Sequence, residues 1–518
     1  MTWKHEAFIQ AVFQGAGYKC QRVPTPDIEA YRAGREYANQ GQCNPAYFTL
    51  GSLIRHLRSL EAQGLSRRDI VDKYVFFTAG GCGPCRFGMY ESEYRHALQS
   101  AGFDGFRILL FQQDHGINAA TGEQGLKFNV DFGLGMLNAV HLGDVIYELG
   151  YRIRPFEVHA GETDRAIDEA VAILSRMLRQ HPPFEIMDAA PRWTRDYLTG
   201  HDKLRRTLNT VGKIRKHLYG KEFLETLDAA RERLNHVETD PLRVRPVVKI
   251  TGEFWAQMTE GDGNFRMFEF LEREGAQVLV EPIATWVAYL LHQAGARAGL
   301  RRDVELHHAR LRWWQWRSRL AQELALRKKT WLFSFGEGLW TYFYERAARR
   351  LGGLSHPLLS QPELARLAHP FFHRMARGGE GHLEVGKSIY YTRNRLCHMI
   401  LALKPFGCMP SAQSDGVHAA VVSRYPDMIF LPVETSGEGE INAHSRVQMA
   451  LGEAKGKAKA EFDAALETSG KRLQDIRAYV DRHPEMRRPF YRLPQQNGVA
   501  GRAAQFILHV SQRMDRGR

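Results

Sequence analysis

Residues 74–85, YVFFTAGGCGPC, begin with a run of β-forming side chains and end in a glycine-rich turn that carries two cysteines. Helical spacing resumes over 87–98, and residues 106–111 (FRILLF) form a second apolar run. A strand, a helix and a further strand in this order predict a βαβ unit with a parallel sheet. We therefore expect an α/β fold with buried strands at 74–78 and 106–111.

The same alternation returns later in the chain. Apolar runs at 241–250, 276–280, 399–403 and 428–433 predict four more strands. Residues 286–350 interrupt this pattern with helix-forming sequence that is rich in Arg and Trp. A second α/β domain is therefore expected.

The length of 518 residues corresponds to about three domains at roughly 150 residues each. We expect a first α/β domain over 1–185, a helical connector over 186–240, a second α/β domain over 241–450 with a helical insertion at 286–375, and a helical, basic C-terminal tail over 451–518.

Composition excludes several classes of protein. Hydrophobic residues make up 44% and charged residues 25%, which is ordinary for a folded chain and excludes disorder as the main state. No apolar run approaches the ~20 residues that a membrane-spanning helix needs, so no membrane association is expected. The N-terminus shows no signal-peptide pattern, so we expect a cytoplasmic protein. Six cysteines are too few for a disulfide framework.

The net charge of +13 raises the question of nucleic-acid binding. The best candidate is 310–320 (RLRWWQWRSRL), where Arg and Trp interleave as they do in proteins that stack single strands. A helical wheel instead places Leu311, Trp314 and Leu320 on a packing stripe with Arg on the other face. For this segment we favour packing or docking over nucleic-acid binding. A basic binding protein stays an alternative function for the chain.

Four of the six cysteines lie in Gly/Pro-rich loops where a parallel sheet places its ligands. Cys82 and Cys85 follow the first predicted strand, Cys408 follows the strand before PFGC, and Cys43 precedes a helix. Iron–sulfur clusters are typically held by four thiolates, and glycine lets the backbone approach such a group closely. These four cysteines therefore predict an iron–sulfur cluster.

Cys82-Gly-Pro-Cys85 alone supports a different function. A strand, a CGPC motif and a helix are typical of a thioredoxin-like dithiol, in which the helix N-terminus lowers a thiol pKa. A thiol–disulfide oxidoreductase of this kind would not need Cys43 or Cys408. The remaining cysteines, Cys20 and Cys397, are expected to be buried apolar side chains.

Three further side chains are candidates for the surroundings of the cluster. Arg86 adjoins Cys85, His115 follows the strand at 106–111, and Glu253 follows the strand that ends near Ile250. Each also has a structural interpretation, as a solvated arginine, a loop histidine and a turn acid.

Five blocks of sequence occur in a fixed order: GREYANQGQCNPAYFTLGSLIRHL (34–57), GPCRFGMY (83–90), RPFEVHAGETD (154–164), ITGEFW with GNFRMFEFLEREGAQV (250–278), and KPFGCMPS (404–411). Together they resemble the 2-hydroxyacyl-CoA dehydratase and benzoyl-CoA reductase family, specifically its activase-related proteins. The resemblance covers most of 20–290 and 380–450.

The resemblance implies two Rossmann-like, doubly wound domains around a [4Fe–4S] cluster, and some relatives carry a double-cubane cluster. Carried over by motif, Cys43, Cys85 and Cys408 are the metal-binding thiolates, and Cys82 is an extra candidate. If Cys82 is not a ligand, one iron is open to a substrate or an outside ligand.

The resemblance also implies partners. The chain would take up low-potential electrons from an ATP-dependent activase, an actin-like ATPase, and pass them to a substrate such as an acyl-CoA or to another cluster. We expect a homo- or hetero-oligomer.

Departures from the family pattern limit what is expected of this chain itself. The phosphate-binding motifs GxGxxG before a helix and GxxxxGK[ST] are missing, so we expect no nucleotide to bind here. The acidic segment of the family reads ETSGEGEINAHSRVQ (434–448) in this chain. Whether the protein is itself a dehydratase or reductase component or only transfers electrons stays open.

Overall fold

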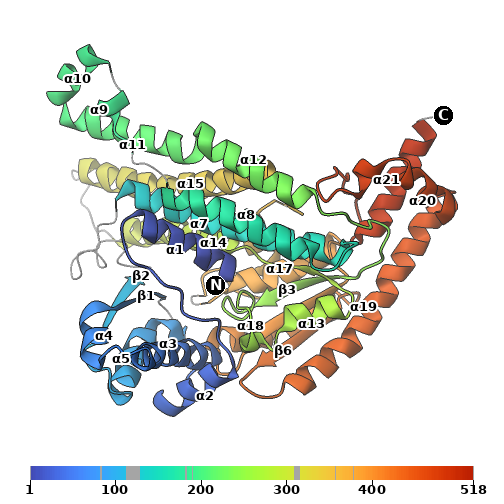
Figure 1. Ribbon diagram of the computed structural model, residues 1–518, viewed down its shortest axis with the longest axis horizontal. Helices are drawn as coiled ribbons and strands as arrows, with labels where there is room; N and C mark the ends of the chain where they lie inside the picture. Colours follow the sequence, from blue (N-terminus) through green and yellow to red (C-terminus); the bar gives the residue numbers. More distant parts are fainter. Residues whose placement is uncertain are drawn as a thin grey trace.

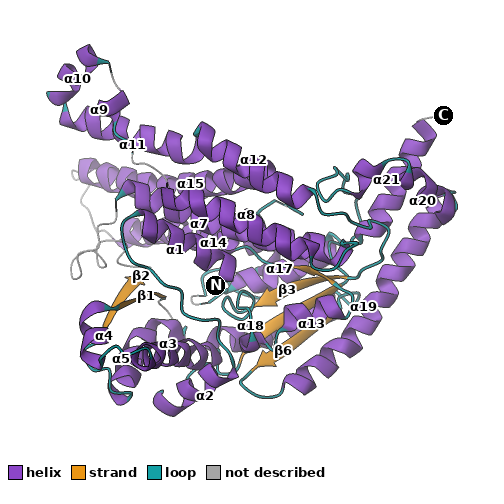
Figure 2. Cartoon of the chain, viewed as in Figure 1, coloured by secondary structure: helices purple, strands orange, loops and turns teal. Residues whose placement is uncertain are grey.

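The computed structural model describes residues 2–81, 85–112, 129–180, 184–189, 191–308, 316–355, 357–376 and 379–516. Within these ranges most of the chain is helical, and the strands form two parallel sheets (Figures 1 and 2). The expected combination of parallel strands and connecting helices is therefore confirmed.

The smaller sheet pairs β1 (Val75–Gly80) with β2 (Arg107–Gln112) in parallel. The connection between them includes η1 (Arg86–Met89) and α5 (Tyr90–Ser100). The positions and the pairing of these strands agree with the sequence prediction, but their expected burial is confirmed only in part, at Ile108 and Leu109. Val75 and Phe111 are each 40% exposed, because among the described residues the sheet has only two strands and both of its edges lack a neighbour.

Helices α2 (Ile28–Tyr37), α3 (Asn44–Ala62) and α4 (Arg67–Lys73) accompany the smaller sheet. Helix α3 contains the helix expected at 49–60 and lies close against α2. A Cβ atom at Gly51 would lie 1.7 Å from the carbonyl oxygen of Ala30, so only glycine permits this approach. Apolar side chains of α3 and α5, with Phe103 and Phe106, form the hydrophobic core of this region.

The larger sheet has the strand order β4-β3-β5-β6, and all of its neighbouring strands are parallel. It comprises β3 (Val247–Gly252), β4 (Gln277–Leu279), β5 (Met399–Pro405) and β6 (Phe430–Thr435). All four agree with predicted strands. Helices α13 (Met267–Arg273) and α18 (Met409–Arg424) connect β3 to β4 and β5 to β6.

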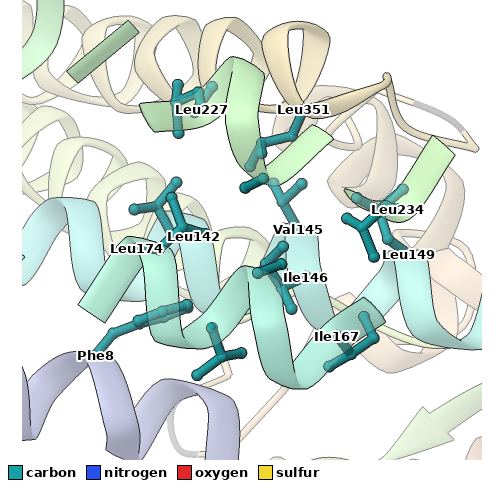
Figure 3. Packing of buried hydrophobic residues seen from close by; sticks show 14 of the residues in the cluster. Phe8, Leu142, Val145, Ile146, Leu149, Ile167, Leu174, Leu227, Leu234 and Leu351 are labelled. Carbon is teal, nitrogen blue, oxygen red and sulfur yellow. The ribbon is translucent and has the colours of Figure 1, made fainter. Parts of the chain in front are cut away.

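A third core is purely helical. It is shared by α1 (Trp3–Gly15), α7 (Val130–Ile153), α8 (Glu162–Gln180), α12 (Lys221–Asn235) and α15 (Trp316–Leu351). Figure 3 shows Phe8, Leu142, Ile146 and Leu174 among the side chains that meet there. Regions that we expected in different parts of the chain, α8 within 1–185 and α12 within 186–240, therefore pack together.

The C-terminal region begins with α19 (Glu440–Ser469), which starts before residue 451, where the helical tail was expected, and packs Val447 and Leu451 on the larger sheet. The other helices are α9 (Ile186–Ala189), α10 (Arg192–Thr199), α11 (Asp202–Tyr219), α14 (Ile283–His308), α16 (Gln361–Ala368), α17 (His382–Arg393), α20 (Leu473–Asp481) and α21 (Arg502–Arg516), with short turns η2 (Arg154–Phe156), η3 (Asp262–Asn264) and η5 (Pro484–Arg487).

The expected helical insertion lies largely in α14 and α15, which pack against each other. Leu311 and Trp314 of the Arg- and Trp-rich segment lie outside the described residues, whereas Leu320 is exposed. None of the helices in the described ranges combines the length and the apolar character that crossing a bilayer requires.

Candidate functional site

Three of the predicted cysteines occupy the same kind of position, the residue directly before a helix. Cys43 precedes α3, Cys85 precedes η1 and Cys408 precedes α18. The first N–H groups of a helix lack partners within the helix, and the helix dipole favours negative charge there. A helix start lowers the pKa of such a thiol, an effect that burial outweighs at all three positions here.

The loops of Cys43 and Cys408 are joined through their backbones. The N–H of Asn44 donates to the carbonyl oxygen of Phe406 over 3.0 Å, and the N–H of Phe406 donates to Thr435. Gly407 has a φ of +75°, and a Cβ atom there would lie 3.4 Å from Cys43 Cα. Two cysteines that are far apart in the sequence are thus held in adjacent loops.

The three thiols are largely withdrawn from water. Cys43 is 7% exposed and its Sγ lies 3.0 Å from the hydroxyl oxygen of Tyr90, while Cys85 and Cys408 are partly buried. Burial raises the pKa of each thiol, to about 12 for Cys85. Without a bound cation these cysteines are therefore protonated at neutral pH.

Two glutamates are common electrostatic neighbours of the thiols. Burial is the largest cause of the raised pKa in all three cysteines, and the charge of Glu253 raises it further. Glu380 also raises the pKa of Cys85 and Cys408, and Cys43 raises that of Cys85. Since such interactions weaken with distance, the three thiols and two carboxyl groups share one neighbourhood.

Backbone groups at the end of β3 position both carboxyl groups. The N–H of Glu253 donates to the carbonyl oxygen of Leu403 over 2.9 Å, and its Oε2 accepts from Ala256. Glu380 is 3% exposed, and its Oε1 accepts from the N–H of Phe254. Burial raises the pKa of Glu253 to about 7; burial, followed by the charges of Glu253 and Glu384, raises that of Glu380 to about 8.

A buried ion pair lies close to Glu380. Lys404 Nζ is 3.0 Å from Glu384 Oε1, and Ser414 Oγ donates to Glu384 Oε2 over 2.5 Å. Lys404 also pairs with the half-exposed Asp415. This network joins β5 to α17 and α18, and so fixes the elements that carry Glu380 and Cys408.

The structure brings together part of the predicted set. Cys43, Cys85, Cys408 and Glu253 share the site, and Arg86 belongs to it because its charge lowers the pKa of Cys43. Cys82 and His115 lie outside the described residues.

The two cysteines excluded from the site are placed differently. Cys397 lies before the amino end of β5, whereas Cys408 follows its carboxyl end. The carbonyl oxygen of Cys20 accepts hydrogen bonds from Gln10 and Gln14 in the helical region of α1.

Sequence reasoning missed Glu380 and Tyr90. Glu380 is flanked by Gly379 and Gly381, whose φ angles of +54° and +50° favour glycine. An acid between two such glycines, in GGEGH, is the signal that marks this turn. No feature of the sequence marks Tyr90 as a site residue apart from its position in GPCRFGMY.

The chemistry of the three thiols bears on which kind of group they could hold. No group of three or more His, Cys, Asp or Glu side chains in the described ranges is arranged to hold one metal ion. A cluster carries its own sulfides between its irons, so its protein thiolates need not converge on one point. Three soft thiols in separate loops at helix starts match the ligands that iron–sulfur clusters use.

Comparison with known proteins gives no relative for this chain. No protein-family model, no curated protein and no solved structure matches it. The resemblance to the dehydratase and reductase family therefore stays a prediction that rests on the quoted sequence blocks.

Proposed function

We propose that this chain is an iron–sulfur protein in which Cys43, Cys85 and Cys408 hold a [4Fe–4S] cluster, with Cys82 as a candidate fourth ligand. The observation that supports this most directly is that a backbone hydrogen bond of 3.0 Å from Asn44 to Phe406 holds the loops of Cys43 and Cys408 side by side. The charge of Glu253 also raises the pKa of all three thiols. The proposal includes electron uptake from an ATP-dependent partner and delivery to an acyl-CoA substrate or another cluster. It also includes the finer fold, two Rossmann-like domains.

The bound cluster would supply one-electron chemistry at low potential. Around it, the helix starts after the three cysteines would direct N–H groups toward negative charge. Partial burial of the thiols would limit contact with water, which strengthens electrostatic interactions at the site.

Glu380 would serve as the proton source in this proposal. Its pKa of about 8 means that it holds a proton at neutral pH, and it lies in the neighbourhood of the thiols. A substrate that accepts an electron there would have a protonated carboxyl group close by.

The thiol–disulfide alternative is less well supported. The reactive thiol of a CGPC motif is its first cysteine, here Cys82, which lies outside the described residues, so the pKa of Cys85, which burial raises to about 12, does not bear on this alternative. The alternative gives no role to Cys43 and Cys408, which share the neighbourhood of Cys85. No observation in the described residues favours a basic binding protein.

Metal analysis after anaerobic purification tests the cluster. We expect about four irons and a similar amount of sulfide per chain. Cys43→Ser, Cys85→Ser and Cys408→Ser should each lose most of this iron, while the matched controls Cys20→Ser and Cys397→Ser should retain it. Cys82→Ser tells whether the fourth cysteine is a ligand.

Two results would contradict the proposal. One is a colourless protein without iron, and a reversible Cys82–Cys85 disulfide in such a protein would favour the oxidoreductase. The other is a cluster that low-potential reductants fail to reduce in a titration followed by electron paramagnetic resonance, which would exclude the electron-transfer role.

A further inference from the structure

A cavity of about 300 Å³ opens between α15 and the two helices α11 and α12, close to the turn that joins these two. Figure 1 shows α12 beside α15, and the two helices are in contact. Ligand cavities in proteins begin at about this volume. The cavity is therefore large enough for a small organic molecule.

The inner wall of this cavity is apolar. Its buried apolar members come from α11, α12 and α15: Leu218, Phe223, Leu227, Phe343 and Ala347. Asn138 also lines the cavity, but its Nδ2 already donates to the carbonyl oxygen of His217 over 3.0 Å. The wall thus suits the hydrocarbon part of a ligand, because contact with such a group removes apolar surface from water.

Positive charge gathers at the mouth of the cavity. Arg346, Arg349 and Arg350 line it together with Tyr342, which is 44% exposed. Arg349 Nη1 is 3.5 Å from Glu345 Oε2, and Arg350 pairs with an aspartate of α12. Ion pairs at an exposed surface contribute little to stability, so an anionic ligand can take the place of either carboxylate.

Arg346 has no carboxylate within ion-pair distance in the part of the chain that the structure describes. Its Cζ lies 4.0 Å from the centroid of the Tyr219 ring, and its Nε is buried without a hydrogen-bond partner among the same residues. The pKa of Tyr342 is lowered, first by its hydrogen bond with Tyr219 and then by Arg346 and Arg349. The mouth therefore carries an excess of positive charge, which favours an anion.

We propose that this cavity binds an amphipathic carboxylate, with its hydrocarbon part on the apolar wall and its carboxylate group at Arg346. A guanidinium group forms charge-assisted, often bidentate hydrogen bonds with a carboxylate. An amine would be repelled by the three arginines, and an anion without a hydrocarbon part would leave the apolar wall unmatched. The proposal does not depend on the cluster, because none of the candidate cluster ligands lines this cavity.

Isothermal titration calorimetry on the full chain tests this site with three probes: octanoate, 1-octanol and octylammonium. The three share one hydrocarbon chain and differ in the charge of the head group. We expect one octanoate to bind per chain. Octanol should bind roughly tenfold more weakly, since it lacks the charge-assisted hydrogen bonds, and octylammonium should not bind.

Variants locate the two parts of the site. Arg346→Gln should weaken octanoate binding by roughly tenfold and leave octanol binding unchanged. Arg327→Gln is the matched control, because Arg327 also lies on α15 and pairs with a glutamate four residues earlier, but does not line the cavity. Leu224→Trp, at a partly buried position in the wall, should fill the cavity and abolish binding of both probes.

No octanoate binding at millimolar concentration, or equal affinity for octanoate and octanol, would overturn the proposal. Unchanged octanoate binding in Arg346→Gln would overturn the position of the carboxylate group. Binding that survives Leu224→Trp, in a protein that circular dichroism shows to be folded, would place the ligand elsewhere and overturn the site. Iron content of the same samples is measured separately, so this proposal and the cluster can fail independently.

Discussion

The backbone N–H of Asn44 donates a hydrogen bond of 3.0 Å to the carbonyl oxygen of Phe406. Asn44 follows Cys43, and Phe406 lies two residues before Cys408, so the bond aligns the two cysteine loops without using either thiol. The spacing of these two loops is therefore set by the main chain.

Replacing Gly407 by alanine should damage this alignment. Gly407 has a φ of +75°, and its new Cβ atom would lie 3.2 Å from the carbonyl oxygen of Gln42 and 3.4 Å from Cys43 Cα. We expect the free energy of unfolding to fall by about 1–3 kcal/mol and the bound iron to fall with it. Urea unfolding and metal analysis measure the two effects.

The matched control is Gly439→Ala. Gly439 has a φ of +96° but nothing within 4 Å of the added Cβ atom, so it reports the backbone cost alone. We expect similar destabilisation without loss of iron. Equal iron content in the two variants would contradict a role for Gly407 in holding the cysteine loops together.

Cys85 should be slow to react with alkylating agents in metal-free protein. With a pKa of about 12, far less of it is thiolate at pH 8 than of an ordinary cysteine, whose pKa is about 8.5. Alkylation by iodoacetamide, followed residue by residue by mass spectrometry, should be at least tenfold slower than for the same cysteine in urea-unfolded chain. Rapid alkylation of Cys85 in the folded protein would contradict a raised pKa for this thiol.

Glu380 should make the stability of the metal-free protein depend on pH. Its pKa is about 8 in the folded chain and about 4.3 in an unfolded one, so folding favours the protonated form. The stabilisation is complete below about pH 4 and is lost as the pH rises toward 8. Glu380→Gln mimics the protonated form, so its advantage over the unmodified protein should grow from pH 5 to pH 8.5.

The size of this effect is at most a few kcal/mol, since one pKa unit corresponds to about 1.4 kcal/mol. Urea unfolding at several pH values measures it, and Glu467→Gln on the exposed side of α19 is the control. A difference between Glu380→Gln and the unmodified protein that does not change with pH would show that Glu380 is already ionised in the folded state.

Local patterns in the sequence were enough to place the strands and most helices, because apolar periodicity is a property of neighbouring residues. The runs around Phe77, Leu109 and Leu401 all lie in strands of the structure. The exposure of β1 could not be predicted, since it depends on how many strands accompany it. The packing of α8 against α12 likewise depends on contacts between distant segments.

The site was predictable where it follows strands. Cys85, Cys408 and Glu253 come shortly after β1, β5 and β3, and the carboxyl ends of parallel strands collect ligand-binding residues. Glu380 follows no strand. It lies at the site because it directly precedes α17, and α17 packs near β3 and β5. This packing joins distant segments, so no local sequence pattern predicts it.

Cys43 and Cys85 belong to the region around the smaller sheet, whereas Cys408 follows the larger sheet, and each region has its own hydrophobic core. A group bound by all three thiols would crosslink the region of the smaller sheet to that of the larger sheet. Binding or loss of the group would change how freely the two regions move relative to each other, while each hydrophobic core stays intact. The relative motion of the two regions would therefore report whether the site is occupied.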